Sequence, residues 1–383
     1  MTNIIKLFSG IGVIIDDAIF EDGSSLNGIQ KIAKSLKKNH IPLLEYNELP
    51  DDEFINQFHG ISFVILDWNL SGEQPIPGAT INDNIAFINK LKTVCFVPLF
   101  IFSDENSHDI QVNLEAHNLL LERCPIFIKK KNELDTAEKL FSEIEHWLKQ
   151  TPSIYVMKEW EKATREAKTK MLWSLSSIHP AWPSVLSKSI KTDGGDGASE
   201  LMRLLHNNLS YRLEFPEFDE QIIEAQKDGV GKNELRKLLE CERFVPKESL
   251  PPHPFAGDIY LIDDKYYLNI RPDCDIIRRP KDMYLIEGKV VDETKINTED
   301  QHAIRFKNGE FIEKKTECYV GFVKGNILRF CLRDMDVMVW KKIKEYRIGR
   351  LLPPYITLIQ QKYAFYIQRQ GLPAIPEEAV KES

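Results

Sequence analysis

The chain has 383 residues, a formal net charge of −8 and an apolar content of 43%. This length exceeds that of one ordinary domain, so we expect two or three domains with apolar cores of their own. No apolar run approaches the roughly 20 residues of a membrane-spanning helix. The first residues have neither the basic start nor the small-residue cleavage site of a signal peptide, so we expect a cytoplasmic protein.

The acidic excess lies at the beginning of the chain. Residues 1–150 hold 13 Lys and Arg against 22 Asp and Glu, whereas the remaining residues hold 37 against 36. Nucleic acids are bound by basic surfaces, and the balanced second part has no strong basic stripe. We therefore expect neither nucleic acid nor membrane as a partner. The six cysteines form no CxxC pair and no zinc-ligand spacing, so we expect neither disulfides nor a zinc site.

Short apolar runs alternate with segments of helical spacing through residues 1–150. We expect strands at residues 12–15, 42–46, 61–66, 95–102 and 125–128, and helices at 26–39, 84–92, 110–122 and 134–149. Strands that are apolar on both faces and alternate with helices form parallel sheets covered on both sides. The sequence therefore predicts a doubly wound parallel α/β domain of the flavodoxin type over residues 1–150.

The pattern changes after residue 150. A helical region is expected at 151–249, with helices at 155–175, 199–209, 220–228 and 232–242 and a Pro- and Gly-containing loop at 176–198. A small, mostly antiparallel β domain is expected at 250–383, with β segments at 258–262, 265–270, 283–291, 303–306, 318–323 and 327–332. Asp263 and Asp264 are expected to form a hairpin turn. Residues 355–370 are expected to form the last helix.

Polar side chains lie at the carboxyl ends of the predicted strands of the first domain. Asp16 and Asp17 follow the first strand, Asp67 the third, Ser103 the fourth and Lys129 the fifth. In open α/β sheets, ligands bind at the carboxyl ends of the strands. Three carboxylates and the backbone carbonyl of Asn69 offer oxygen ligands for Mg²⁺. We therefore expect one polar site at this edge of the sheet.

This set of residue types suits phosphoryl transfer, which needs positioning and charge neutralisation. Asp67 would be the nucleophile, Lys129 would pair with a phosphoryl oxygen, and the Ser103 hydroxyl would hydrogen-bond the phosphorylated form. Each side chain also has an ordinary structural role. The aspartates and Ser103 could cap helices, and Lys129 could belong to a solvated run of charge. The ordered set on successive strand ends favours the site.

The ordered set Asp16, Asp17, Asp67, Ser103 and Lys129 resembles the receiver domains of two-component response regulators. The resemblance implies a Mg²⁺ requirement, a sensor histidine kinase as phosphoryl donor and Asp67 as the phosphorylated residue. Two features depart from the family pattern. Lys130 follows Lys129 where many receivers have proline, so either lysine could point into the site. The loop at residues 71–83 is longer than usual and could carry a specific contact.

The whole chain has a second resemblance. The long receiver, the segment at residues 257–276 and the segment at residues 350–376 are similar to the receiver component of the Detocs anti-phage system. That family resembles a two-component pathway with a sensor kinase, a stand-alone receiver protein and a receiver-bearing effector. The resemblance implies a protein that accepts phosphoryl groups and buffers the effector against leaky activation. The resemblance also implies that the protein is not an enzyme and catalyses only its own Mg²⁺-dependent phosphorylation and dephosphorylation.

An alternative is a response regulator whose second half is an unrecognised enzymatic or nucleic-acid-binding effector. Catalytic candidates there are His253, Asp258, Asp273 and Asp275, although the last two also fit a turn after Pro272. The helix at 232–242 carries glutamates on its face and does not have the basic character of a recognition helix. The aromatic stripe of the last helix fits a core better than a docking surface. The sequence leaves the oligomeric state and the phosphoryl lifetime open.

Overall fold

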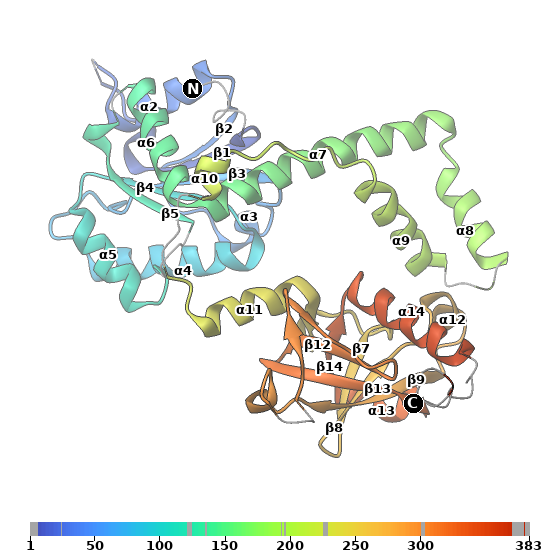
Figure 1. The fold of residues 1–383 in the computed structure, drawn as a ribbon. Coiled ribbons are helices and arrows are strands. Elements are labelled where there is room, and N and C mark those ends of the chain that lie inside the picture. Colours follow the sequence, from blue (N-terminus) through green and yellow to red (C-terminus); the bar gives the residue numbers. More distant parts are fainter. Residues whose placement is uncertain are drawn as a thin grey trace. The chain divides into compact units, whose positions relative to one another are not determined.

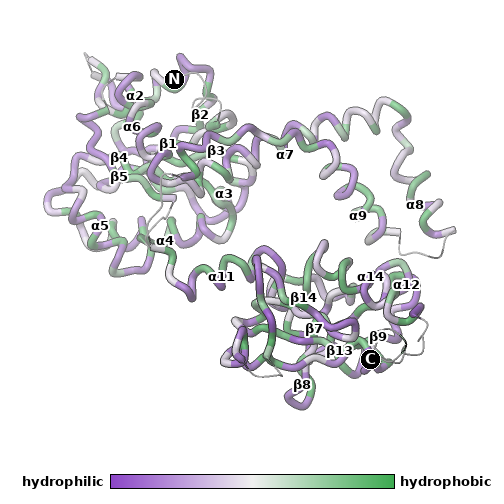
Figure 2. The backbone as a smooth tube through the Cα atoms, in the orientation of Figure 1, coloured by the Kyte–Doolittle hydropathy of each residue, from purple (hydrophilic) through white to green (hydrophobic). Residues whose placement is uncertain are grey.

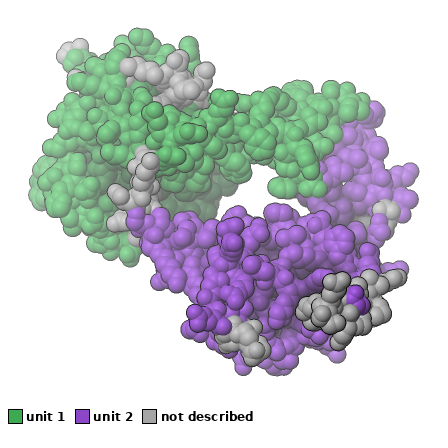
Figure 3. Space-filling model, in the orientation of Figure 1, with its two compact units in different colours: residues 1–178, 206–228 green, residues 179–205, 229–383 purple. Residues whose placement is uncertain are grey.

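The computed structural model describes residues 7–23, 25–120, 125–134, 136–192, 194, 197–224, 229–299, 303–369 and 379. The chain forms two compact units (Figure 3). Unit 1 contains residues 1–178 and 206–228, and unit 2 contains residues 179–205 and 229–383. The region expected as a separate helical domain at 151–249 is therefore divided between the two units. No helix in the described parts of the chain is long and apolar enough to cross a bilayer.

Unit 1 is built on a five-stranded sheet in which every neighbouring pair is parallel (Figure 1). The strand order is β2-β1-β3-β4-β5, where the strands are β1 (Ile11–Ile15), β2 (Leu43–Tyr46), β3 (Ile61–Leu66), β4 (Leu99–Ser103) and β5 (Ile126–Lys130). All residues of the central strand β3 are buried, as expected for a parallel sheet covered on both faces. The predicted doubly wound α/β fold is confirmed.

Helices cover both faces of this sheet, and each face has its own apolar core. The helices are α2 (Gly28–Lys38), α3 (Asp52–Ile55), α4 (Gly78–Val94), α5 (Ser107–Ala116) and α6 (Ala137–Gln150). Side chains of α2 and α6 fill one core, and side chains of α3, α4 and α5 fill the other. Figure 2 shows the hydrophobic residues concentrated on the inner strands of the sheet. The carboxyl ends of the strands therefore lie at one edge of a rigid, double-sided core.

The helix α7 (Pro152–Ile178) continues unit 1 beyond the sheet. Ile154 and Tyr155 at its start belong to the core beside α6. The buried Lys158 donates hydrogen bonds to the carbonyl and hydroxyl of Ser62 at 3.1 and 3.4 Å, and burial lowers its pKa. The short helix α10 (Glu220–Ile223) returns to the same place, where the backbone N–H of Asp219 donates to the Tyr155 hydroxyl at 3.0 Å. These contacts hold both segments on unit 1.

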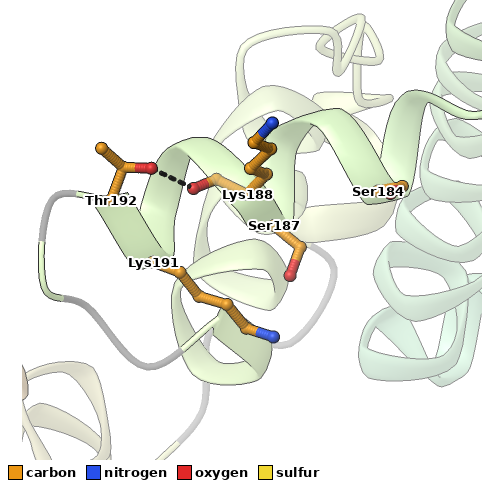
Figure 4. Close-up of a pocket in the computed structure, with 5 residues that line it drawn as sticks. All are labelled: Ser184, Ser187, Lys188, Lys191 and Thr192. Atoms are coloured by element: carbon orange, nitrogen blue, oxygen red, sulfur yellow. Dashed lines mark hydrogen bonds between the residues drawn. The ribbon is translucent and has the colours of Figure 1, made fainter.

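Along the chain, three further helices follow α7 before the second sheet begins. They are α8 (Trp182–Thr192), α9 (Gly197–Ser210) and α11 (Lys232–Arg243). The prediction of a loop at 176–198 was wrong, because residues 176–178 still belong to α7 and residues 182–192 form α8. Pro183 lies in the first turn of α8, where proline does not disturb a helix. A hollow beside α8 is lined by Ser184, Ser187, Lys188, Lys191 and Thr192 (Figure 4). Since none of the helix's residues is buried, this hollow is an open surface and no enclosed site.

Unit 2 contains a seven-stranded antiparallel sheet, as predicted. Its order is β12-β13-β9-β8-β7-β14-β6, where the strands are β6 (Phe244–Pro246), β7 (Asp258–Ile262), β8 (Lys265–Asn269), β9 (Asp282–Val290), β12 (Glu317–Val323), β13 (Asn326–Val339) and β14 (Arg347–Leu351). Asp263 and Asp264 have φ values of 48° and 61° and form the two-residue turn between β7 and β8. The hairpin β10 (Phe306–Lys307) and β11 (Glu310–Phe311) stands apart from this sheet.

Helices complete both faces of unit 2. They are α12 (Asp273–Arg278), α13 (Trp340–Ile343) and the C-terminal α14 (Tyr355–Gln368). Ile356 and Ile359 of α14 belong to the larger core of the sheet, and Tyr363 packs against it. The aromatic stripe of this helix is therefore largely a packing surface, although Phe365 is 75% exposed. A smaller core on the other face contains Tyr260, Met283 and Ile276.

Candidate functional site

Three aspartates meet at the carboxyl edge of the unit 1 sheet. Asp16 follows β1 and caps the short helix η1 (Asp17–Phe20), and Asp67 follows β3. The Asp67 backbone N–H donates to the Ile15 carbonyl at 2.8 Å, which fixes the two strand ends side by side. One carboxylate oxygen each from Asp16, Asp17 and Asp67 lie within 4.8 Å of one another. This cluster could bind a metal ion.

The lysine that contacts this cluster is Lys131. Its Nζ lies 2.7 Å from Asp16 Oδ2 and 2.8 Å from Asp67 Oδ2, and all three side chains are buried. The prediction that Lys129 occupies this place was wrong, because Lys129 pairs with Glu133 and Glu143 at 3.2 and 3.1 Å.

The physical reason is the length of β5. This strand extends two residues beyond its predicted end at residue 128, so Lys129 still lies within the sheet. Lys130, the alternative site lysine, is also a strand residue, in register with Ser103. Lys131 is the first residue after the strand and opens the short helix η2 (Lys131–Glu133).

The other predicted site residues lie at the same edge. Ser103 is the last residue of β4 and is 2% exposed, and its hydroxyl accepts from the Glu105 N–H at 3.5 Å. The Asn69 backbone N–H donates to Asp67 Oδ1 at 3.3 Å, and the Asn69 carbonyl accepts from the Gly72 N–H at 3.4 Å. The geometry places Asn69 next to Asp67, and Ser103 at the neighbouring strand end.

The site holds an excess of negative charge in a poorly solvated place. Burial raises the pKa of Asp16 to about 6, against the lowering effect of Lys131. Burial, followed by the charge of Asp67, also raises the pKa of Asp17. Burial would lower the pKa of Lys131, but Asp67 and Asp16 outweigh it and raise that pKa. One ammonium among three carboxylates leaves room for a divalent cation, and carboxylate oxygens are the ligands that Mg²⁺ prefers.

Asp16 would make the binding of a metal ion to this cluster depend on pH. Its folded pKa of about 6 lies above the ordinary 3.8, so between these values the folded chain holds a proton that the unfolded chain has lost. The contribution of Asp16 to stability therefore falls as pH rises through this window, and the charged site then favours a cation. We expect Mg²⁺ to raise the thermal midpoint more at pH 7.5 than at pH 5. Thermal scans with and without Mg²⁺ measure this, and equal shifts at both pH values would contradict it.

Asp258 and His253, two of the candidate residues of unit 2, take part in contacts that hold its strands together. Asp258 is fully buried and accepts hydrogen bonds from Arg350 Nε at 2.6 Å and Arg347 Nη1 at 3.4 Å. His253 contributes only its backbone carbonyl, which accepts from both arginines.

The aspartates around α12 also have structural partners. Asp273 accepts from the Ala256 N–H at 2.8 Å. Arg271 donates to the backbone carbonyls of Asp275, Arg279 and Asp282. These contacts hold the ends of strands and the helix α12 in place.

The chain matches no protein-family model, and a search of curated proteins finds none that is similar to it. The fold and the site therefore define its class. Unit 1 is a receiver-like α/β domain with an acidic cluster at the carboxyl edge of its sheet.

Proposed function

We propose that unit 1 is a receiver domain that accepts a phosphoryl group on Asp67. The observation that supports this most directly is the position of Asp67. Its carboxylate is 7% exposed, touches the Lys131 ammonium at 2.8 Å and lies in one cluster with Asp16 and Asp17. A carboxylate held between a cation and two further acidic groups is suited to attack phosphorus once a metal ion has neutralised the excess charge.

The residues of this edge would divide the work. Asp67 attacks the phosphorus of a phosphohistidine, the P–N bond breaks, and its electron pair returns to the imidazole, which takes a proton from solvent. Asp16, Asp17, Asp67 and the Asn69 carbonyl would hold Mg²⁺, and the ion would neutralise negative charge at this edge. Lys131 pairs with a phosphoryl oxygen, and the Ser103 hydroxyl donates to another.

We further propose that the chain serves a two-component-like bacterial defence against phage. Its donor is a sensor histidine kinase, and its role is to capture phosphoryl groups and so buffer a receiver-bearing effector of the same system. This part of the proposal rests on the resemblance to the Detocs receiver component described from the sequence. The lifetime of the phosphoryl group on Asp67 decides whether such a protein buffers or signals.

The Asp67→Asn variant tests the phosphoacceptor. We expect it to lose Mg²⁺-dependent labelling by a small phosphodonor such as acetyl phosphate, because an amide oxygen is a poor nucleophile toward phosphorus. Loss of label should exceed 100-fold, about 2.7 kcal/mol or more in the barrier. Asp109→Asn, at an exposed site on α5, is the matched control and should label normally. Undiminished labelling of Asp67→Asn would refute the proposal.

The alternative is a response regulator in which unit 2 is the effector. This alternative is worth testing because unit 2 has apolar cores of its own. Expression of residues 229–383 alone, the part of unit 2 that contains its sheet, tests it. A fragment that began at residue 151 would also carry the start of α7 and the helix α10, which pack on unit 1. The later boundary at residue 229 is therefore preferable. Toxicity or nuclease activity of this fragment would favour the effector and contradict the buffer.

A further inference from the structure

The helix α8 has no face in an apolar core. None of its residues is buried, and Val185 is 63% exposed. A helix of 11 residues is marginal in water by itself, because helices in proteins gain most of their stability from packing an apolar face. In its own unit, α8 contacts the first residue of α9, where Ser187 and Lys191 lie beside Gly197. Most of the surface of α8 therefore has room for a partner.

One stripe of α8 is both hollowed and basic. The hollow in Figure 4 is lined by the short side chains of Ser184 and Ser187 and by two lysines, Lys188 and Lys191. The two lysines extend away from each other, so positive charge lies on both sides of the short side chains. Residues 179–192 contain no acidic residue that would neutralise this charge. A partner that fits this face offers carboxylates and bulky apolar side chains.

The segment 211–220, which follows α9 and ends at the start of α10, has these properties. Tyr211 and Phe215 are 94% and 90% exposed. The same ten residues include four acidic side chains and one arginine. Aromatic side chains supply much of the binding energy of interfaces, so two of them standing in water mark a docking surface. This segment is therefore the complement of the basic face of α8 in charge and in shape.

Two contacts hold the segment in place on unit 1. The Lys170 ammonium of α7 donates to the Glu214 carboxylate at 2.5 Å, and the ring of Phe218 lies edge-on to that of Tyr155, with centroids 6.3 Å apart. Since these contacts already order the backbone, less conformational entropy is lost when the exposed aromatic side chains are covered. The segment is thus presented in advance for binding.

The helix α9 separates the two surfaces along the chain. The helix α8 lies against its first residue, and the segment 211–220 follows its last residue. Two α9 helices that pack antiparallel about a twofold axis therefore bring α8 of one copy beside the segment of the other, and the reverse contact is identical. Met202, near the middle of α9, is 66% exposed and would lie close to that axis.

We propose that the chain forms a twofold dimer in which the segment 211–220 of each copy docks on α8 of the other. Tyr211 and Phe215 cover the hollowed face, and Lys188 and Lys191 face the carboxylates of the segment. A second copy is the occupant that the charges favour, because the acidic segment and the basic helix belong to the same chain and each is uncovered in it.

The size of this contact suits a stable dimer. The two aromatic side chains bury about 300–500 Å² together, and the helix that they cover loses a similar area. Two such contacts bury about 1,200–2,000 Å² in all, which is the range of specific protein interfaces. Met202 adds apolar area at the axis.

Sedimentation velocity of the full chain, without a phosphodonor, tests the dimer. We expect a dimer above about 1 µM, the weak end of the range for interfaces of this size. Phe215→Ala should weaken association by at least about 30-fold, the factor for truncating an aromatic residue at the centre of an interface. Phe365→Ala removes a comparably exposed ring on α14 and should leave association unchanged. A chain that stays monomeric well above this concentration would overturn the proposal, as would equal effects of the two variants.

Reversal of charge tests which surfaces meet. The double variant Lys188→Glu, Lys191→Glu should weaken association about tenfold or more, because acidic residues then face the acidic segment. The double variant Glu217→Lys, Glu220→Lys should have a similar effect. The chain with all four changes pairs opposite charges again and should recover most of the affinity. Association that stays weak in this chain, or that neither double variant weakens, would overturn the pairing of the two surfaces.

Cross-linking of lysines to carboxylates shows whether the contact joins two copies. In an equal mixture of unlabelled and isotope-labelled chain, we expect Lys188 or Lys191 to be linked to Glu217 in peptide pairs of which one member is labelled. Links found only within one chain would overturn the dimer.

Discussion

The Lys131→Ala variant should be strongly destabilised in the absence of divalent cations. It leaves Asp16 and Asp67 buried without the ammonium that lies 2.7 and 2.8 Å from them. Breaking a buried ion pair from one side costs about 3–5 kcal/mol. Mg²⁺ should restore more stability to this variant than to the unmodified protein, because the ion replaces the missing positive charge. Chemical denaturation with and without Mg²⁺ measures both effects.

Lys129→Ala is the matched control for this variant. Lys129 is a neighbouring lysine of the same run, and its partners Glu133 and Glu143 are at least partly exposed. Pairs of this kind contribute about 1 kcal/mol or less. We therefore expect Lys129→Ala to lose little stability, and we expect Mg²⁺ to stabilise it no more than it stabilises the unmodified protein. A larger effect of Lys129→Ala than of Lys131→Ala, on stability or on phosphoryl labelling, would contradict the assignment of the site lysine.

The Asp258→Ala variant should unfold unit 2 much more easily. Asp258 is fully buried, and its carboxylate is the partner of Arg350 and Arg347. Its removal leaves two largely buried guanidinium groups without their counter-charge, at a cost of about 3–5 kcal/mol. Burial raises the pKa of this carboxyl against the effect of both arginines, so Asp258→Asn should be tolerated better. Chemical denaturation followed by tryptophan fluorescence measures the change.

This variant also separates a structural from a catalytic role of Asp258. Asp275→Ala changes an exposed aspartate of α12 and should alter stability by no more than about 0.5 kcal/mol. Phosphoryl labelling of unit 1 should be the same in both variants. Full stability of Asp258→Ala would show that the arginine contacts do not hold unit 2 together.

Much of the fold follows from local pattern. Strands β1 and β3 of unit 1 are nearly continuous apolar runs, and the hairpin turn at Asp263 and Asp264 has a sequence typical of its geometry. Two elements were hidden for physical reasons. Pro180 and Pro183 suggest a break, although a proline in the first turn costs α8 nothing. Most of the second half of β13 is exposed, and only the short alternation of Met335, Val337 and Val339 with Asp334 and Asp336 marks it as a strand.

The site was predictable to the extent that it depends on strand ends. Asp16 and Asp67 follow clear apolar runs, so their meeting follows from parallel pairing. The lysine depends on where β5 ends, and three successive lysines give no signal of this. The side-chain amides of Asn69 and Gln74 both donate to Glu105, which lies 36 and 31 positions further along the chain, and no local pattern encodes these contacts.

The most direct test of this account is to map the phosphorylated residue. The full chain is incubated with a phosphodonor, and its peptides are examined by mass spectrometry with Mg²⁺ present and with Mg²⁺ chelated. We predict a phosphoryl group on the peptide that contains Asp67, dependent on Mg²⁺. Phosphorylation of a different residue, or of Asp67 to the same extent without a divalent cation, would contradict the account.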